Sequence, residues 1–179
     1  MGKYCGFLAL VSGIASGAER VYLHEEGVRI KDLMKDLESL VEGFSKGKRL
    51  GLMIRNEKAN DLYDTQFMAA LFEEEGGDLF DVRQAILGHL QQGGDPSPHD
   101  RILAIRLAKL CIEYLVQESL AGNTPASFIG MQKREVSFVS MSNWTELVDT
   151  NYQRPKEQWW LNLRDIARKM NTPPDGVEY

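Results

Sequence analysis

The pattern of hydrophobic and polar residues along the chain predicts helices that alternate with short strands. Between residues 30 and 44 apolar positions recur at steps of three and four, which indicates one face of a helix: Ile30, Leu33, Met34, Leu37, Leu40, Val41 and Phe44. Short apolar runs predict strands at 21–23, 50–54 and 82–87. Further helices are predicted around them, at 4–16, 65–75 and 100–119. This order favours an α/β layered fold with a mainly parallel sheet.

The pattern changes towards the end of the chain. Two short apolar runs at 128–131 and 136–139, separated by four polar residues, predict a hairpin or two short strands. A last helix is predicted at 159–170, and the Pro-rich stretch 172–176 is expected to fray. We therefore predict one α/β domain over residues 1–122, followed by a C-terminal segment of different character over residues 123–179.

Composition and charge limit the classes of function. Hydrophobic residues make up 43% and charged residues 26% of the 179-residue chain, the balance of a globular protein. The formal net charge of −5 argues against a nucleic-acid partner, which needs a basic face. Residues 7–11 resemble a short signal peptide, but glycines interrupt the run, and no stretch is long enough to span a membrane. The two cysteines are too few for a disulfide framework and are expected to be reduced thiols, so a cytoplasmic location is expected.

Candidate chemistry lies where the predicted strands end, because ligands of open α/β sheets bind beyond the carboxyl ends of strands. Glu57 follows the second strand, Arg83 lies in the third, and a glycine-rich stretch with His89 follows it. A carboxylate suits sugar hydroxyls, a guanidinium fork suits phosphate, and glycines let backbone N–H groups approach an anion. Each residue also has a structural explanation, as an ion pair, a buried histidine or a turn. Together they indicate a polyhydroxylated, phosphorylated small molecule.

Three segments in order, 1–6, 55–57 and 86–101, strongly resemble the 6-phosphofructokinase family. The resemblance runs from residue 1 to about residue 168, and 155–161 is similar to the C-terminal halves of animal-type enzymes. It implies a three-layer phosphofructokinase-like fold, with 1–122 as the sugar-phosphate and effector domain. Residues 123–179 would then pack on a nucleotide-type domain that this chain does not contain.

The resemblance also implies a function. Such enzymes are tandem duplications that make fructose 1,6-bisphosphate from fructose 6-phosphate and ATP in glycolysis. Their C-terminal half binds the activator fructose 2,6-bisphosphate, and Gln92 stands where catalytic halves have Arg. The family's ATP loops and catalytic aspartate have no match here. The expectation is thus no catalytic residue and no cofactor in this chain, with ATP and Mg²⁺ bound elsewhere in a full-length phosphotransferase that forms a homo-oligomer, expected to be a tetramer.

The resemblance also implies which residues bind the ligand, although an ungapped match puts Gln153, one residue before Arg154, at the family's second phosphate-binding arginine. The binding residues are Met1, Gly2 and Lys3 at a helix start, Glu57 on the sugar hydroxyls, Arg83 on a phosphate across a subunit or half interface, His89, Leu90, Gln91 and Gln92 as the other wall, and Arg154 on a second phosphate. Lys3 departs from the glycine of regulatory halves and is closer to the arginine of catalytic halves. Two alternatives therefore stay open: a catalytic-half fragment that binds fructose 6-phosphate, and an interaction module that binds no ligand.

Overall fold

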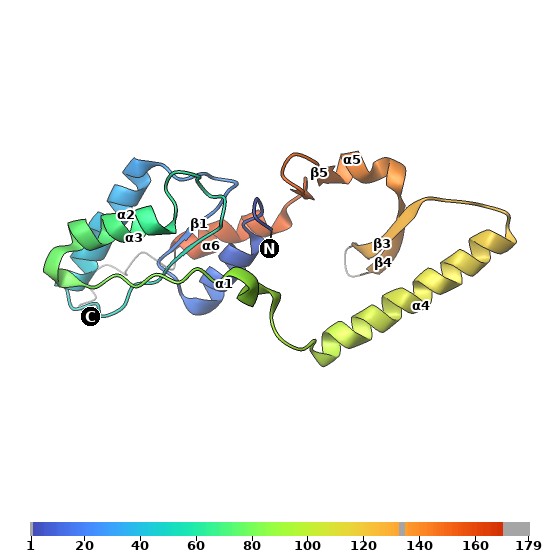
Figure 1. Cartoon of the computed structure of the whole chain (residues 1–179), viewed down its shortest axis with the longest axis horizontal. Helices are drawn as coiled ribbons and strands as arrows, with labels where there is room; N and C mark the ends of the chain where they lie inside the picture. The colour runs from blue at the N-terminus through green and yellow to red at the C-terminus, as the bar shows by residue number, and fades with distance from the viewer. Residues whose placement is uncertain (1, 133–134, 170–179) are drawn as a thin grey trace. The chain divides into compact units, whose positions relative to one another are not determined.

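The computed structural model describes residues 2–132 and 135–169, so Met1, Met170 and the predicted frayed end lie outside the described residues. The described chain forms two compact units. The first unit combines Met1–Gly88 with Asn151–Tyr179, and the second comprises His89–Thr150. Figure 1 traces the chain through both units.

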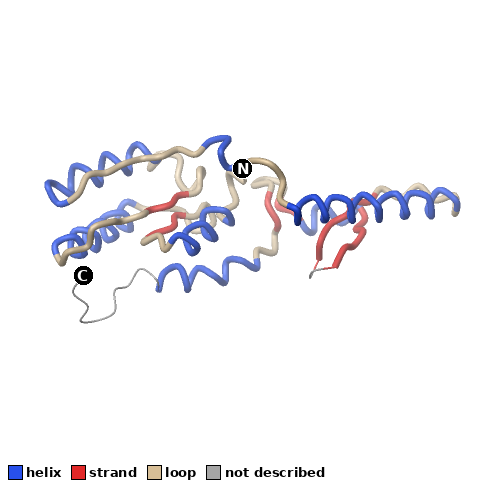
Figure 2. The backbone as a smooth tube through the Cα atoms, turned by 90° about the horizontal axis from the view of Figure 1, so that it is seen from below, coloured by secondary structure: helices blue, strands red, loops and turns tan. Residues whose placement is uncertain are grey.

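A two-stranded parallel sheet lies at the centre of the first unit. Strand β1 (Arg20–Tyr22) pairs with β2 (Met53–Arg55). Helices surround the two strands, as Figure 2 shows: α1 (Phe7–Ser16), α2 (Ile30–Ser45), α3 (Thr65–Gly76) and α6 (Arg164–Lys169). Short 3-10 turns (η1, Gly77–Leu79; η4, Trp159–Leu163) and strand β6 (Arg154–Pro155) complete this unit.

Two hydrophobic cores form because side chains along a strand point alternately to opposite faces. Tyr22 of β1 packs with α2 and α3, in a core that includes Leu33, Leu37, Met68 and Phe72. Leu23 packs instead with α1 and α6, in a core of Leu10, Leu23, Trp160 and Ala167. The sheet is thus covered by helices on both faces, as a layered α/β arrangement requires.

Helix α1 lies unusually close to β1. A Cβ atom on Gly13 would lie 2.2 Å from Cγ2 of Val21, so only glycine permits this approach. The helix ends at Gly17, whose φ of 68° is the left-handed conformation typical of a helix C-terminus.

The second unit contains the long helix α4 (Pro98–Leu120) and an antiparallel hairpin of β3 (Ser127–Gln132) and β4 (Glu135–Ser140). Ser97 and Asp100 form a reciprocal cap at the start of α4. The ring of Tyr114 stacks on Phe138 of the hairpin, with centroids 4.1 Å apart. Shorter elements are η2 (Gly88–Gln92), which begins in the first unit, η3 (Met141–Asn143), α5 (Trp144–Leu147) and β5 (Val148–Asp149).

The prediction of a third strand at 82–87 is wrong. The segment is extended, but it has no assigned strand, since a strand needs a partner backbone to pair with. It is held by its start, where Phe80 packs on Phe44 and the Val82 N–H donates to Glu73. Ile86 stays 71% exposed. Within the described residues the mainly parallel sheet is thus reduced to the pair β1–β2 in a helix-rich molecule.

The predicted last helix is also shorter than expected. Residues 159–163 form the 3-10 turn η4, and α6 begins only at Arg164. Among the residues that the structure describes, every helix is too short or too polar to cross a membrane.

Candidate functional site

Polar residues gather at the carboxyl edge of the parallel pair. His24 and Glu25 come just after β1, and Asn56 and Glu57 come directly after β2. Because parallel strands end at the same edge, these four residues lie on one side of the sheet. This edge is the position that the sequence predicts for a ligand.

The N-terminal turn, residues 2–5, is fastened to this edge. The Asn56 side-chain amide donates to the carbonyl oxygens of Gly2 and Cys5, at 3.3 and 3.4 Å. The Lys58 N–H donates to the Lys3 carbonyl at 3.2 Å, and Gly2 has a φ of 66° that suits glycine. Asn56 is buried, so the turn is held firmly against β2.

This turn brings Lys3 next to Glu57. Lys3 Nζ lies 3.6 Å from Glu57 Oε1, and the two side chains are 64% and 53% exposed. Such a solvated pair contributes little to stability. Both side chains are therefore available to a ligand, one as a cation for phosphate and the other as an acceptor for hydroxyl groups.

Arg154 enters the same region from β6, and its Nη1 is paired by protein atoms. Its Nη1 donates to the Tyr4 carbonyl at 2.6 Å and to His24 Nδ1 at 2.8 Å, and it forms a 3.1 Å ion pair with Glu25. The side chains of Arg154 and Glu25 are only 12% and 5% exposed. Arg154 Nε is buried and has no hydrogen-bond partner among the described residues.

Glu25 connects this ion pair to the start of α1. Both carboxylate oxygens accept from the Gly6 N–H at 3.1 Å. Free N–H groups at a helix start favour an anion, and here the chain's own carboxylate occupies that position. An exogenous phosphate at this helix start would have to share it with Glu25.

This arrangement disfavours the charged form of His24. Burial and, next, the Arg154 guanidinium lower the pKa of His24, while Glu25 and Asp61 act in the opposite direction. A guanidinium only donates, so His24 Nδ1 accepts and the ring proton is assigned to Nε2. The ring also packs edge-on against Tyr4 and Tyr152, with centroids 5.2 and 4.7 Å away.

The other predicted site residues are less enclosed. Arg83 lies in the extended segment after α3, is 89% exposed, and has a 4.0 Å ion pair with Asp81. His89, Leu90, Gln91 and Gln92 form the exposed turn η2, and they are counted with the second unit. The structure thus brings Lys3, Glu57 and Arg154 to one edge of the first unit. Met1 lies outside the described residues.

Three residues of this edge were not predicted from the sequence: Tyr4, His24 and Glu25. The signal was available, since His24 and Glu25 follow β1 as Asn56 and Glu57 follow β2. The partnership with Arg154 could not be found, because Glu25 and Arg154 lie far apart in the chain and share no local pattern. Among the described residues, no three His, Cys, Asp or Glu side chains gather as a metal site needs.

Comparison with known proteins gives consistent matches. A family model described as phosphofructokinase matches residues 1–115. The muscle-type ATP-dependent 6-phosphofructokinase of Equus caballus is 40% identical over 178 residues, which cover 94% of this chain and 23% of that protein. The ATP-dependent 6-phosphofructokinase of Dictyostelium discoideum is 40% identical over 176 residues, which cover 97% of this chain and 21% of that protein.

A solved structure is similar as well. The phosphofructokinase of Saccharomyces cerevisiae superimposes with a TM-score of 0.87 at 30% identity, over 94% of this chain and 24% of that one. The chain thus spans less than a quarter of the length of the horse and Dictyostelium proteins.

Proposed function

The chain belongs to the phosphofructokinase family, and we propose that it is the part of an ATP-dependent 6-phosphofructokinase that binds the activator fructose 2,6-bisphosphate. The observation that carries this proposal is the meeting of Lys3 and Glu57, 3.6 Å apart, at the carboxyl edge of the parallel strands. A cation beside an acceptor, at the edge where α/β sheets bind ligands, suits a phosphorylated sugar.

In the proposed site, Met1, Gly2 and Lys3 line one side and Glu57 accepts from sugar hydroxyls. Arg154 takes the second phosphate in this proposal, while Glu25 and His24 hold its guanidinium in place. This role agrees with the burial of Arg154, since a rigid guanidinium loses less entropy on binding than a mobile one.

Arg83 and the turn η2 form the other wall in this proposal. The exposure of Arg83 supports a role towards a ligand or a neighbouring subunit, because no close partner immobilises it among the described residues. Gly88 at the start of η2 and Gly93 just after it have φ values of 53° and 76°, and they bracket His89, Leu90, Gln91 and Gln92. These glycines leave backbone N–H groups near the surface, where they can approach phosphate. We propose that a homo-oligomer, a tetramer for the full-length enzyme, completes the site.

We assign no phosphoryl transfer to this chain. The described residues offer no cluster that fits a magnesium ion, and the sequence has none of the family's ATP loops or its catalytic aspartate. ATP and Mg²⁺ belong to other parts of the proposed full-length enzyme, which acts in glycolysis in the cytoplasm. The isolated chain is thus a binding segment without turnover.

A second candidate is the fructose 6-phosphate pocket of a catalytic half. Lys3 favours this candidate. At its position catalytic halves have an arginine and regulatory halves a glycine, and Lys3 supplies a cation beside Glu57 as an arginine would. Gln92 favours the regulatory half. Changing Gln92 to Arg in the full-length enzyme separates the two: activation by fructose 2,6-bisphosphate is damaged in the first case, and fructose 6-phosphate affinity changes in the second.

Calorimetric titration of the chain with each sugar phosphate tests the proposal. Fructose 2,6-bisphosphate is expected to bind more tightly than fructose 6-phosphate, and Glu57→Gln to weaken it at least tenfold. Glu74→Gln, which removes the same charge from an exposed position of α3, serves as the control. Tighter binding of fructose 6-phosphate would establish the second candidate instead. If neither sugar phosphate binds to the chain or to the full-length enzyme, both candidates are wrong, and the chain is an interaction module that binds no ligand.

A further inference from the structure

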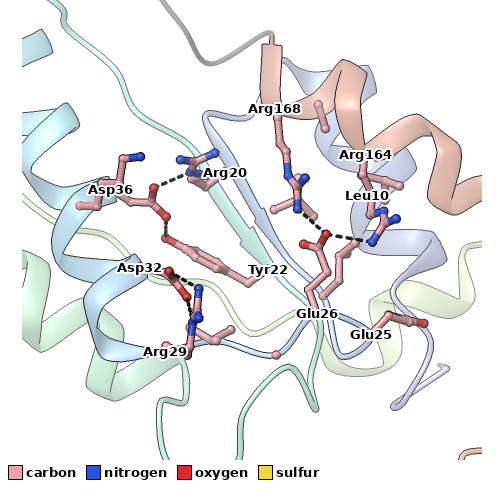
Figure 3. A pocket seen from close by; sticks show the side chains of 16 residues that line it. Leu10, Arg20, Tyr22, Glu25, Glu26, Arg29, Asp32, Asp36, Arg164 and Arg168 are labelled. Atoms are coloured by element: carbon pink, nitrogen blue, oxygen red, sulfur yellow. Dashed lines mark hydrogen bonds and ion pairs between the residues drawn. The ribbon is translucent and has the colours of Figure 1, made fainter.

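A polar cavity lies in the first unit, between α2, β1 and α6. Its volume is about 460 Å³, within the range of small-molecule sites. Figure 3 shows it from close by, with Arg20 and Tyr22 on β1, Asp36 on α2, and Arg164 and Arg168 on α6. Glu25, which pairs with Arg154 at the proposed sugar-phosphate site, also lines this cavity, whereas Lys3, Glu57 and Arg154 do not.

Positive charge exceeds negative charge around this cavity. The lining cations are Arg20, Arg29, Lys35, Arg164 and Arg168, and the lining carboxylates are Glu25, Glu26, Asp32 and Asp36. Glu25 is already used by Arg154 and the Gly6 N–H, and in Figure 3 it is directed away from Glu26. Five cations thus share three carboxylates.

The excess of positive charge is concentrated on α6. A single oxygen, Glu26 Oε1, accepts from Arg164 Nη1 at 3.1 Å and from Arg168 Nη2 at 2.6 Å. Asp165 is the other carboxylate near Arg168, at 3.9 Å, and it is 83% exposed. Two guanidiniums one helical turn apart therefore repel each other with only one close carboxylate between them. Each guanidinium keeps N–H donors that these contacts do not use.

The opposite wall supplies two further cations. Arg20 uses its Nε on the buried Asp36, which also accepts from the Tyr22 hydroxyl at 2.9 Å. The Nη atoms of Arg20 are not part of that contact. Lys35, one position before Asp36, is exposed and forms no ion pair within the described part of the chain. An anion in the cavity can therefore reach cations from both walls.

We propose that this cavity is a second anion site, which binds the phosphate group of a small molecule between Lys35, Arg20 and Arg168. Guanidinium forks match phosphate oxygens, and such charge-assisted hydrogen bonds are stronger than neutral ones. The cavity is larger than a phosphate ion, so it leaves room for the remainder of a phosphorylated metabolite. The inference does not depend on the sugar-bisphosphate proposal, since it uses different residues.

Titration with pyrophosphate tests the site, with amide chemical shifts of the chain as one readout and calorimetry as the other. The variant Lys35→Gln/Arg168→Gln removes two exposed cations that the cores do not need, and Lys31→Gln/Lys169→Gln removes the same charge from the same helices outside the cavity. Pyrophosphate is expected to shift the amides of Gly27 and Ala167. Its dissociation constant at this site is expected to rise at least tenfold in the first variant and less than twofold in the second.

Two results would overturn the proposal. One is a set of shifts confined to the N-terminal turn and to 88–94, which would assign all pyrophosphate binding to the proposed sugar-phosphate site. The other is equal weakening by both variants, which would show a general charge effect. Malonate provides the chemical control, because it is a compact dianion without phosphate geometry; malonate binding as tight as that of pyrophosphate would refute the assignment to phosphate.

Discussion

Replacing Arg154 by Met removes the cation that holds three segments together. The guanidinium joins the Tyr4 carbonyl, His24 Nδ1 and Glu25, which lie 129 or more positions away in sequence. Met keeps most of the aliphatic volume, so the change isolates the polar contacts. Glu25, 5% exposed, is left with the Gly6 N–H.

The magnitude follows from the burial of the pair. Removing one partner of a buried ion pair costs about 3–5 kcal/mol, because the other charge stays buried without compensation. Arg154 keeps 12% exposure, so we expect the lower end, about 3 kcal/mol of unfolding free energy. For a protein of this size that corresponds to a decrease of about 6–12 °C in Tm.

Urea denaturation followed by circular dichroism measures this loss. Arg106→Met, an exposed arginine of α4, is the control and is expected to change stability by less than about 0.5 kcal/mol. Glu25→Gln combined with Arg154→Met should cost less than the sum of the single changes, with a coupling of about 2 kcal/mol. A loss below about 1 kcal/mol for Arg154→Met, or strict additivity in the double variant, would refute the reasoning.

Three further predictions concern other parts of the first unit. Gly13→Ala should destabilise the protein by about 1–2 kcal/mol despite the better helix propensity of alanine, because its Cβ would collide with Val21; a gain in stability in urea would contradict the packing. The lowered pKa of His24 means that the unfolded chain takes up a proton more readily, so stability is lost as pH falls below about 6.5. His24→Gln should reduce the loss of Tm between pH 7.5 and 5.5, and an unchanged loss would exclude this source. Arg83→Ala should weaken fructose 2,6-bisphosphate binding by the full-length enzyme at least tenfold, about 1.4 kcal/mol, and unchanged calorimetric affinity would remove Arg83 from the site.

Much of the first unit could be predicted because its elements carry strong local signals. The apolar steps from Ile30 to Phe44 give α2 almost to the residue, and Asp64 caps α3 through the Phe67 N–H. The first two strands also form near their predicted positions. The segment 82–87 shows the limit: its apolar residues favour a strand, but pairing depends on a neighbour that local sequence does not specify.

The candidate site divides in the same way. Glu57 could be predicted because it follows a strand, and Lys3 because the N-terminal segment carries a family motif. The environment of Arg154 could not be predicted, since it depends on packing between the two ends of the first unit. The sequence also predicts a helix start at Gly2 and Lys3 that could hold an anion. The structure shows that the carboxylate of Glu25 already accepts from the Gly6 N–H there.

A crystal structure of the full-length enzyme with fructose 2,6-bisphosphate tests the central claim most directly. The quantity to measure is the distance from the ligand to the edge where β1 and β2 end. We expect a sugar hydroxyl at hydrogen-bond distance, about 2.6–3.2 Å, from the Glu57 carboxylate, with a phosphate beside Lys3 or Arg154. A ligand bound with no contact to Glu57, Lys3 or Arg154 would contradict the account.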